Sequence, residues 1–248
     1  MPLIDEDAAQ HGFGFRFGWG ADGLAALAPV CGVIVIVDVL RFTSAVSVAV
    51  AGGSIVFPYP WRDDRAGDYA IERRAVLAGR REDGPVSLSP TDLVSLPRGS
   101  RIVLPSPTGS TLSFAAREMG ASVVLAGSLR NAAATADRAI ALAGGRPVGV
   151  IASGERWPRS SAPLRPSVED MLGAGAVLAK LDPAAAVVDG CSPEADAARA
   201  AFLAAKPRLA DALATCSSGR ELARIGFADD VLTAAELDAG NVAAQLVN

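Results

Sequence analysis

Hydrophobic positions along the chain fall into short apolar runs that alternate with longer segments of helical spacing. The run at 33–37, Val-Ile-Val-Ile-Val, is β-branched and carries no polar residue, which predicts a strand covered on both faces. The segment at 13–19 alternates instead, which predicts a half-exposed strand at a sheet edge. Further strands are expected at 54–57, 75–77, 101–104, 122–126, 147–151 and 185–188, and helices at 44–51, 109–119, 131–143, 168–180, 193–205 and 208–215.

This order of elements predicts the fold class. Strands that alternate with helices at short intervals form βαβ units, so we expect an α/β protein: a three-layer α/β/α sandwich with a mainly parallel, mixed sheet. No linker long enough to divide the chain is visible, so residues 1–248 are expected to form a single domain. The proline-rich, charged stretch at 58–97 should hold loops and short helices, and a short tail should follow residue 215.

Composition narrows the classes of function. Half of the 248 residues are hydrophobic and 20% are charged, which argues against a disordered chain. The net charge is −4 without a lysine or arginine stripe, so nucleic acid is not an expected partner. No run of about 18 apolar residues occurs, and the acidic N-terminus does not resemble a signal peptide. We therefore expect a soluble, cytoplasmic protein with no membrane partner. The three widely spaced cysteines indicate neither a zinc site nor a disulfide framework.

The end of the run at 33–37 carries the clearest candidate chemistry. Asp38 falls at the carboxyl end of the predicted strand, where open α/β sheets bind ligands. Arg41, Thr43 and Ser44 lie at the start of the next helix, whose first N–H groups have no partner within the helix and favour an anion. An acid that can hold a cation, beside groups that can hold an oxyanion, suggests phosphate chemistry. The alternative is that Asp38 and Thr43 only cap the helix.

Small polar residues also follow other predicted strands. With the turn at Asp38, the loops after 101–104, 122–126 and 147–151 are expected to make four loops on the carboxyl edge of one sheet, where hydroxyl and N–H groups can surround phosphate oxygens. The sequence contains no GxxxxGK[ST] motif and no GxGxxG after a strand. Each turn alone could also be an ordinary helix N-cap. The phosphate-binding candidates in these turns are Ser106, Thr108, Gly109, Ser110, Ser128 and Asn131.

Glu169 and Asp170 form a second candidate acid pair, at the start of the helix expected at 168–180. Carboxylate oxygens without a nearby histidine or cysteine suit Mg²⁺ rather than zinc. The same pair could be the ordinary acidic first turn of a helix. His11 is the only histidine and lies in a predicted tail, so a histidine base from this chain is not expected.

The order of several segments along the chain is similar to that of a known protein family. They are VIVDVLRFTSAVSVAVAGG, LPSPTGSTLS, AGSLRNAAATA, LRPSVEDMLGAGAVLAKL and the closing SSGRELARIGFADDVLTAAELDAGNVAAQLV. Their order and spacing, over roughly residues 31 to 240, resemble the 2-phosphosulfolactate phosphatase (ComB-like) family. The resemblance implies an Mg²⁺-dependent acid phosphatase with an α/β/α fold. Its substrate would be a phosphorylated sulfolactate, a small phosphorylated acid of coenzyme M biosynthesis.

The resemblance also identifies site residues. By position, Asp38 and Arg41 match the acid and arginine of the family's first motif, and Glu169 and Asp170 match its ED pair. The remaining matches are Gly109 and Ser110 in the glycine–hydroxyl turn, Ser128 and Asn131 in the GSxxNA segment, and Ser217, Gly219 and Asp230 in the C-terminal pattern.

The chain departs from the family pattern at four places. Arg80 stands where the family has the acid of "GER", and Thr108 stands for an asparagine. The segment 84–90, which contains Leu88, lacks the Asp and Asn of "FDLGNSP", and Gly173 replaces a cysteine. Losing a hydrogen-bond partner of a charged group costs about 1.5–3 kcal/mol, enough to change substrate preference.

The mechanism expected from these residues keeps two alternatives open. Asp38 with Glu169 or Asp170 would hold Mg²⁺, while Arg41 and the N–H groups at 109–110 would stabilise charge on the phosphoryl group. The attacking group is either water or Asp38 itself; Leu40 stands where a DxD motif would need a second acid, which favours water.

Two other functions fit the same residues. The protein could be a phosphatase of another small phosphorylated carboxylate, or a non-catalytic anion-binding protein that kept the fold. The helices at 193–215 and the edge strand at 13–19 could support a homodimer.

Overall fold

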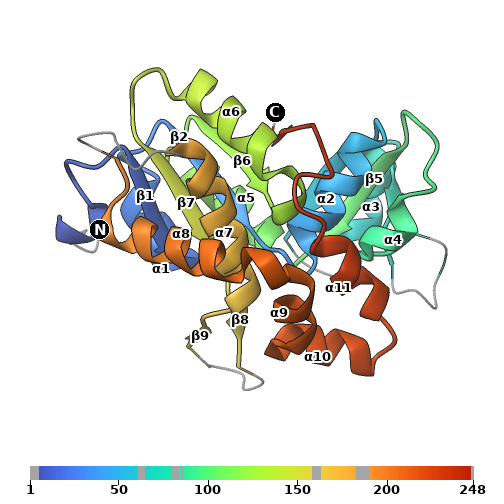
Figure 1. Ribbon diagram of the computed structural model, residues 1–248. Coiled ribbons are helices and arrows are strands. Elements are labelled where there is room, and N and C mark those ends of the chain that lie inside the picture. The colour runs from blue at the N-terminus through green and yellow to red at the C-terminus, as the bar shows by residue number, and fades with distance from the viewer. Residues whose placement is uncertain are drawn as a thin grey trace.

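Mainly parallel sheets between helices form the framework of the protein, and the predicted α/β/α class is confirmed (Figure 1). The computed structural model describes residues 6–60, 65–79, 84, 86–157, 163–182 and 190–246. Its strands are β1 (Phe15–Trp19), β2 (Val33–Val37), β3 (Ile55–Tyr59), β4 (Val76–Leu77), β5 (Arg101–Pro105), β6 (Val123–Gly127), β7 (Val148–Ala152), β8 (Glu155–Arg156), β9 (Leu164–Arg165) and β10 (Ala244–Gln245). Its α-helices are α1 (Gly20–Leu27), α2 (Phe42–Ala51), α3 (Arg65–Glu72), α4 (Pro90–Leu93), α5 (Gly109–Glu118), α6 (Ala132–Ala143), α7 (Val168–Leu181), α8 (Pro193–Ala205), α9 (Leu209–Thr215), α10 (Ser217–Arg224) and α11 (Ala228–Ala234).

The larger sheet has the strand order β1-β7-β2-β6-β10. Its β1, β7, β2 and β6 strands run parallel, and only β10 runs antiparallel to its neighbour. Among the described strands β1 comes last in this order, as its alternating sequence predicted, although a parallel bridge also joins its Phe15 to Cys191. The strand β2 occupies the centre, so its carboxyl end lies between the ends of β6 and β7.

The pleat of β2 explains its unbroken apolar run. Val33, Val35 and Val37 belong to a hydrophobic core shared with α6, α7 and α8. Ile34 and Ile36 point to the opposite face and pack with residues of α1 and α5. Both faces of the strand are therefore buried beneath helices, which is the three-layer arrangement expected from the sequence.

The expectation that all four polar loops share one sheet edge was wrong. The strands β3, β5 and β4 form a separate three-stranded parallel sheet. Helix α2 packs on one face of this sheet, and α3 packs on the other. The loop 106–111 thus follows a strand of the smaller sheet, although α5 itself packs on the larger one.

The C-terminal segment is more structured than the sequence indicated. Helices α10 and α11 and strand β10 occur where a short tail was expected. Between β7 and α7, the short strands β8 and β9 pair antiparallel. The predicted strand at 185–188 and Arg80 lie outside the described residues. In the described part of the chain, no helix has both the length and the apolar character needed to cross a membrane.

Candidate functional site

Asp38 lies at the carboxyl end of β2 and faces the first turns of two helices. Its Oδ2 accepts hydrogen bonds from the Gly109 N–H at 2.8 Å and from the Thr108 hydroxyl at 2.5 Å, at the start of α5. Its Oδ1 receives a long contact of 3.4 Å from the N–H of Phe42, the first residue of α2. The loop before α5 thus reaches Asp38 from the neighbouring sheet. Thr108 supplies one of these bonds.

Close packing at Asp38 explains why position 109 is a glycine. A Cβ atom there would lie 2.3 Å from Cδ1 of Phe42 and 2.8 Å from Oδ2 of Asp38. Both distances are shorter than real Cβ contacts, so a side chain at 109 would displace the carboxylate or the ring. The absence of a side chain at Gly109 therefore allows Asp38 and Phe42 to approach this closely.

Four carboxylates interact around this point: Asp38, Glu155, Glu169 and Asp170. Burial raises the pKa of Asp38 above its ordinary value, and the charge of Glu169 adds to this effect, while its three hydrogen bonds oppose it. Burial raises the pKa of Glu155 to about 7, and the charge of Asp38 acts in the same direction. This cluster concentrates negative charge where little water can screen it.

Asp170 connects the ends of β2 and β7. Its Oδ1 accepts a hydrogen bond from the Val39 N–H at 2.7 Å, and its Oδ2 accepts one from the Gly154 N–H at 2.9 Å. Burial raises the pKa of Asp170 well above its ordinary value, with further contributions from the charges of Asp38 and Glu169. Because Val39 directly follows Asp38 and Gly154 directly precedes Glu155, the carboxylate of Asp170 fixes the spacing between those two acids.

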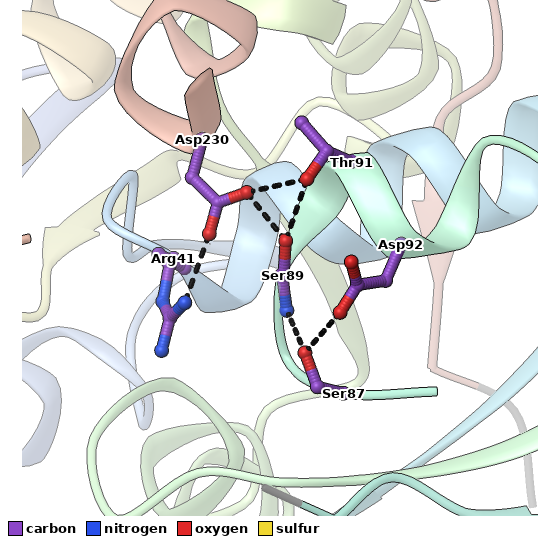
Figure 2. Close-up of polar contacts among 6 residues, drawn as sticks. All are labelled: Arg41, Ser87, Ser89, Thr91, Asp92 and Asp230. Carbon is purple, nitrogen blue, oxygen red and sulfur yellow. Dashed lines mark hydrogen bonds and ion pairs between the residues drawn. The ribbon is translucent and has the colours of Figure 1, made fainter. Parts of the chain in front are cut away.

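Arg41 lies at the start of α2, three residues after Asp38. Its guanidinium forms an ion pair of 2.8 Å with Asp230 of α11, and it lies over the ring of Phe227 at 4.2 Å from the centroid. Ser89 donates a hydrogen bond of 2.5 Å to the other oxygen of Asp230 (Figure 2). Three segments distant in the sequence thus meet at this arginine.

Five other predicted phosphate-binding residues are completely buried, and their side chains lie in the protein interior: Thr43, Ser44, Ser110, Ser128 and Asn131. The hydroxyls of Thr43, Ser44 and Ser110 donate to backbone carbonyls of residues 38, 39 and 104, respectively. Ser128 and Asn131 form a reciprocal capping box before α6. These contacts stabilise the turns that carry the site. Ser106 is also buried, and its hydroxyl lies 3.2 Å from that of Thr108.

Glu155 was not among the site residues expected from the sequence, and Asp230 was expected only as a match to the C-terminal pattern, without a role. Glu155 had the same signal as Asp38, since it is an acid shortly after the carboxyl end of a buried strand. The Cys216 thiol also lies in this region, next to Glu169. Burial, with the charge of Glu169, raises its pKa to about 12. At neutral pH this thiol is therefore protonated and a poor nucleophile.

The donor set of the cluster fits a hard divalent cation. No three histidine, cysteine, aspartate or glutamate side chains of the described residues form a ready ligand group for a metal. Mg²⁺ does not need one, because it commonly takes one or two carboxylates and completes its shell with water and phosphate oxygens. Asp38 and Glu169 supply oxygens only, and Oδ1 of Asp38 has just the one long contact.

Comparison with known proteins agrees with this chemistry. The model of the family described as 2-phosphosulpholactate phosphatase matches residues 25–248, which is almost the whole chain. No curated protein matches the chain. The chain therefore belongs to the 2-phosphosulpholactate phosphatase family, a family of phosphoric monoester hydrolases.

Proposed function

We propose that the protein hydrolyses the phosphate monoester of a small acid, with 2-phosphosulfolactate as the first candidate substrate, and that it requires Mg²⁺. The observation that carries the proposal is the acid cluster around Asp38 at the carboxyl end of the central strand, with Arg41 three residues further along the chain at the start of α2. This arrangement pairs groups that bind a cation with a group that binds an anion, as phosphoryl transfer requires.

The metal would be held by Asp38 and Glu169. When bound, it would neutralise charge on the phosphoryl oxygens. Asp170 uses both carboxylate oxygens for backbone N–H groups, so we assign it to positioning rather than to metal binding. The N–H of Gly109 donates to Asp38, so we assign it to holding that carboxylate rather than the phosphoryl group.

Arg41 would bind the phosphoryl oxygens directly. Its ion pair with Asp230 involves one terminal nitrogen, and 16% of the side chain is exposed. The guanidinium retains donors for an oxyanion, and charge-assisted bonds of this kind gain strength as charge develops in the transition state. We propose water as the attacking group, because the two short hydrogen bonds to Oδ2 of Asp38 hold its carboxylate in place.

Phosphate release from three substrates tests the proposal. Purified protein should be assayed with racemic 2-phosphosulfolactate, phospholactate and a generic aryl phosphate, each with Mg²⁺ and with EDTA. Mg²⁺-dependent turnover that is fastest on the sulfonate is the expected result. Faster turnover of phospholactate would support the phosphatase activity but contradict 2-phosphosulfolactate as the preferred substrate. Folded protein without turnover on any of them would contradict the proposal and favour an anion-binding protein.

A further inference from the structure

Arg41 is held by two residues of the C-terminal segment from two different directions. The carboxylate of Asp230 contacts the edge of the guanidinium at 2.8 Å, and the ring of Phe227 lies against its face at 4.2 Å. An edge contact fixes rotation within the guanidinium plane, and a face contact fixes the plane itself. The two together leave this long side chain little freedom.

The two partners of this ion pair use different shares of their hydrogen-bonding groups, which a purely structural ion pair would not require. Asp230 is only 1% exposed, and both its oxygens have partners: Arg41 on Oδ2, and the hydroxyls of Ser89 and Thr91 on Oδ1 at 2.5 and 2.9 Å. Arg41 uses one nitrogen, and the described part of the chain supplies no other hydrogen-bond acceptor for its side chain. The carboxylate is therefore fully paired, whereas the arginine has donors left over.

Ser89, one of the two hydroxyls that hold Asp230, lies in the segment 84–90, where the chain departs from the expected family pattern, and Thr91 follows this segment directly. The N–H of Ser89 donates to the hydroxyl of Ser87 at 3.0 Å, and that hydroxyl donates to Asp92 at 2.6 Å (Figure 2). These bonds fix the segment in the position from which Ser89 and Thr91 reach Asp230. The chain thus uses hydroxyls here to support a charged group of a distant helix.

We propose that Asp230, supported by Ser89 and acting together with the ring of Phe227 on the arginine, is a positioning residue that sets the Arg41 guanidinium for the phosphoryl group. The proposal rests on the proposed function, and it extends the site from the end of β2 to the C-terminal helix α11. Asp230 contacts no reacting atom in this account and acts only through Arg41. A misplacement of a binding group by about 1 Å can cost on the order of 10²-fold in rate.

The test is a double-mutant cycle between Asp230→Asn and Arg41→Ala, measured as kcat and KM for phosphate release and as binding of inorganic phosphate by calorimetry. In the wild-type background, Asp230→Asn should lower kcat/KM by about 10- to 100-fold and weaken phosphate binding. In the Arg41→Ala background, it should change either quantity by less than about 2-fold, because its effect passes through the arginine. An equal loss in both backgrounds would overturn the proposal and leave Asp230 a purely structural residue.

Two further variants keep the result interpretable. Asp229→Asn alters the exposed neighbour on the same helix and should leave all values unchanged. Ser89→Ala removes one of the hydroxyls that donate to Asp230 and leaves the contacts of Arg41 unchanged. This variant should lower kcat/KM by about 3- to 10-fold, and it can be measured even if Asp230→Asn folds poorly. Full activity in folded Ser89→Ala and Asp230→Asn proteins would refute the positioning role while the phosphatase stands. Phosphate binding that depends on Asp230, in a protein without turnover, would support the positioning role and contradict the proposed function.

Discussion

Substituting Gly109 with alanine is the most direct structural perturbation of Asp38. The added methyl would lie 2.3 Å from the Phe42 ring, more than 1 Å short of the 3.4 Å at which ordinary contact begins, and 2.8 Å from the Asp38 carboxylate. Crowding of this kind in a packed interior costs about 1–3 kcal/mol. For a chain of this size that corresponds to a fall in Tm of roughly 2–4 °C per kcal/mol.

The effect on activity should exceed the effect on stability. If the carboxylate moves away from the methyl group, it loses the 2.8 Å bond from the backbone N–H and the geometry of the cluster. We therefore expect kcat/KM of Gly109→Ala to fall by on the order of 10²-fold.

The assay combines phosphate release with thermal unfolding followed by circular dichroism. Gly67→Ala is a matched control, because a Cβ at position 67 of α3 meets no atom within 4 Å. That variant should keep full activity and gain up to about 1 kcal/mol, since alanine is the better helix former. Wild-type turnover in Gly109→Ala, whatever its Tm, would refute the claim that the position of Asp38 controls the reaction.

Three further outcomes follow from the buried ionisable groups. Because burial raises the pKa of Glu155 from 4.5 to about 7, the folded state holds its proton more tightly, and stability should fall as pH rises from about 4.5 to 7. The Tm of Glu155→Gln should change less over this range, and an identical pH profile would contradict this. Asp170→Ala leaves two buried backbone N–H groups unpaired and should lower the free energy of unfolding by about 2–6 kcal/mol in urea titrations; an unchanged midpoint would show that these bonds contribute nothing. Burial raises the pKa of Cys31 and Cys191 to about 11 and that of Cys216 to about 12, so iodoacetamide at pH 7.5 should label the native protein slowly and leave its activity intact; rapid inactivation would point to a reactive thiol.

Local patterns in the sequence predicted where helices and strands occur better than they predicted which strands pair with each other. The apolar run of β2 and the acid that follows it placed Asp38 at the carboxyl end of a central strand. The pairing of β3, β5 and β4 into a second sheet was not predictable, because strand partners depend on contacts between distant segments. Helices α10 and α11 span only eight and seven residues, too few for hydrophobic spacing to give a clear helical signal.

The same contrast between local patterns and contacts with distant residues applies to the candidate site. Asp38, Glu169 and Asp170 were visible because each comes directly after a buried strand or lies in the first turn of a helix, whereas Glu155 was missed. The roles of Thr108 and Asp230 were not visible, because each depends on a contact with a residue 70 or more positions away. Hydroxyls at helix starts were ambiguous for a physical reason: the groups that bind phosphate are the same groups that cap helices, and at Ser110 and Ser128 the structure uses them for the protein's own backbone and turns.

Whether Asp38 is the centre of the site is tested by phosphate release from 2-phosphosulfolactate by wild-type protein and Asp38→Asn, with Mg²⁺ and with EDTA. We expect Mg²⁺-dependent release by the wild type. We also expect a loss on the order of 10²–10³-fold in the folded variant, since the amide keeps the shape of the carboxylate and loses its charge. Near-normal release by Asp38→Asn would contradict the claim that this carboxylate is the centre of the site.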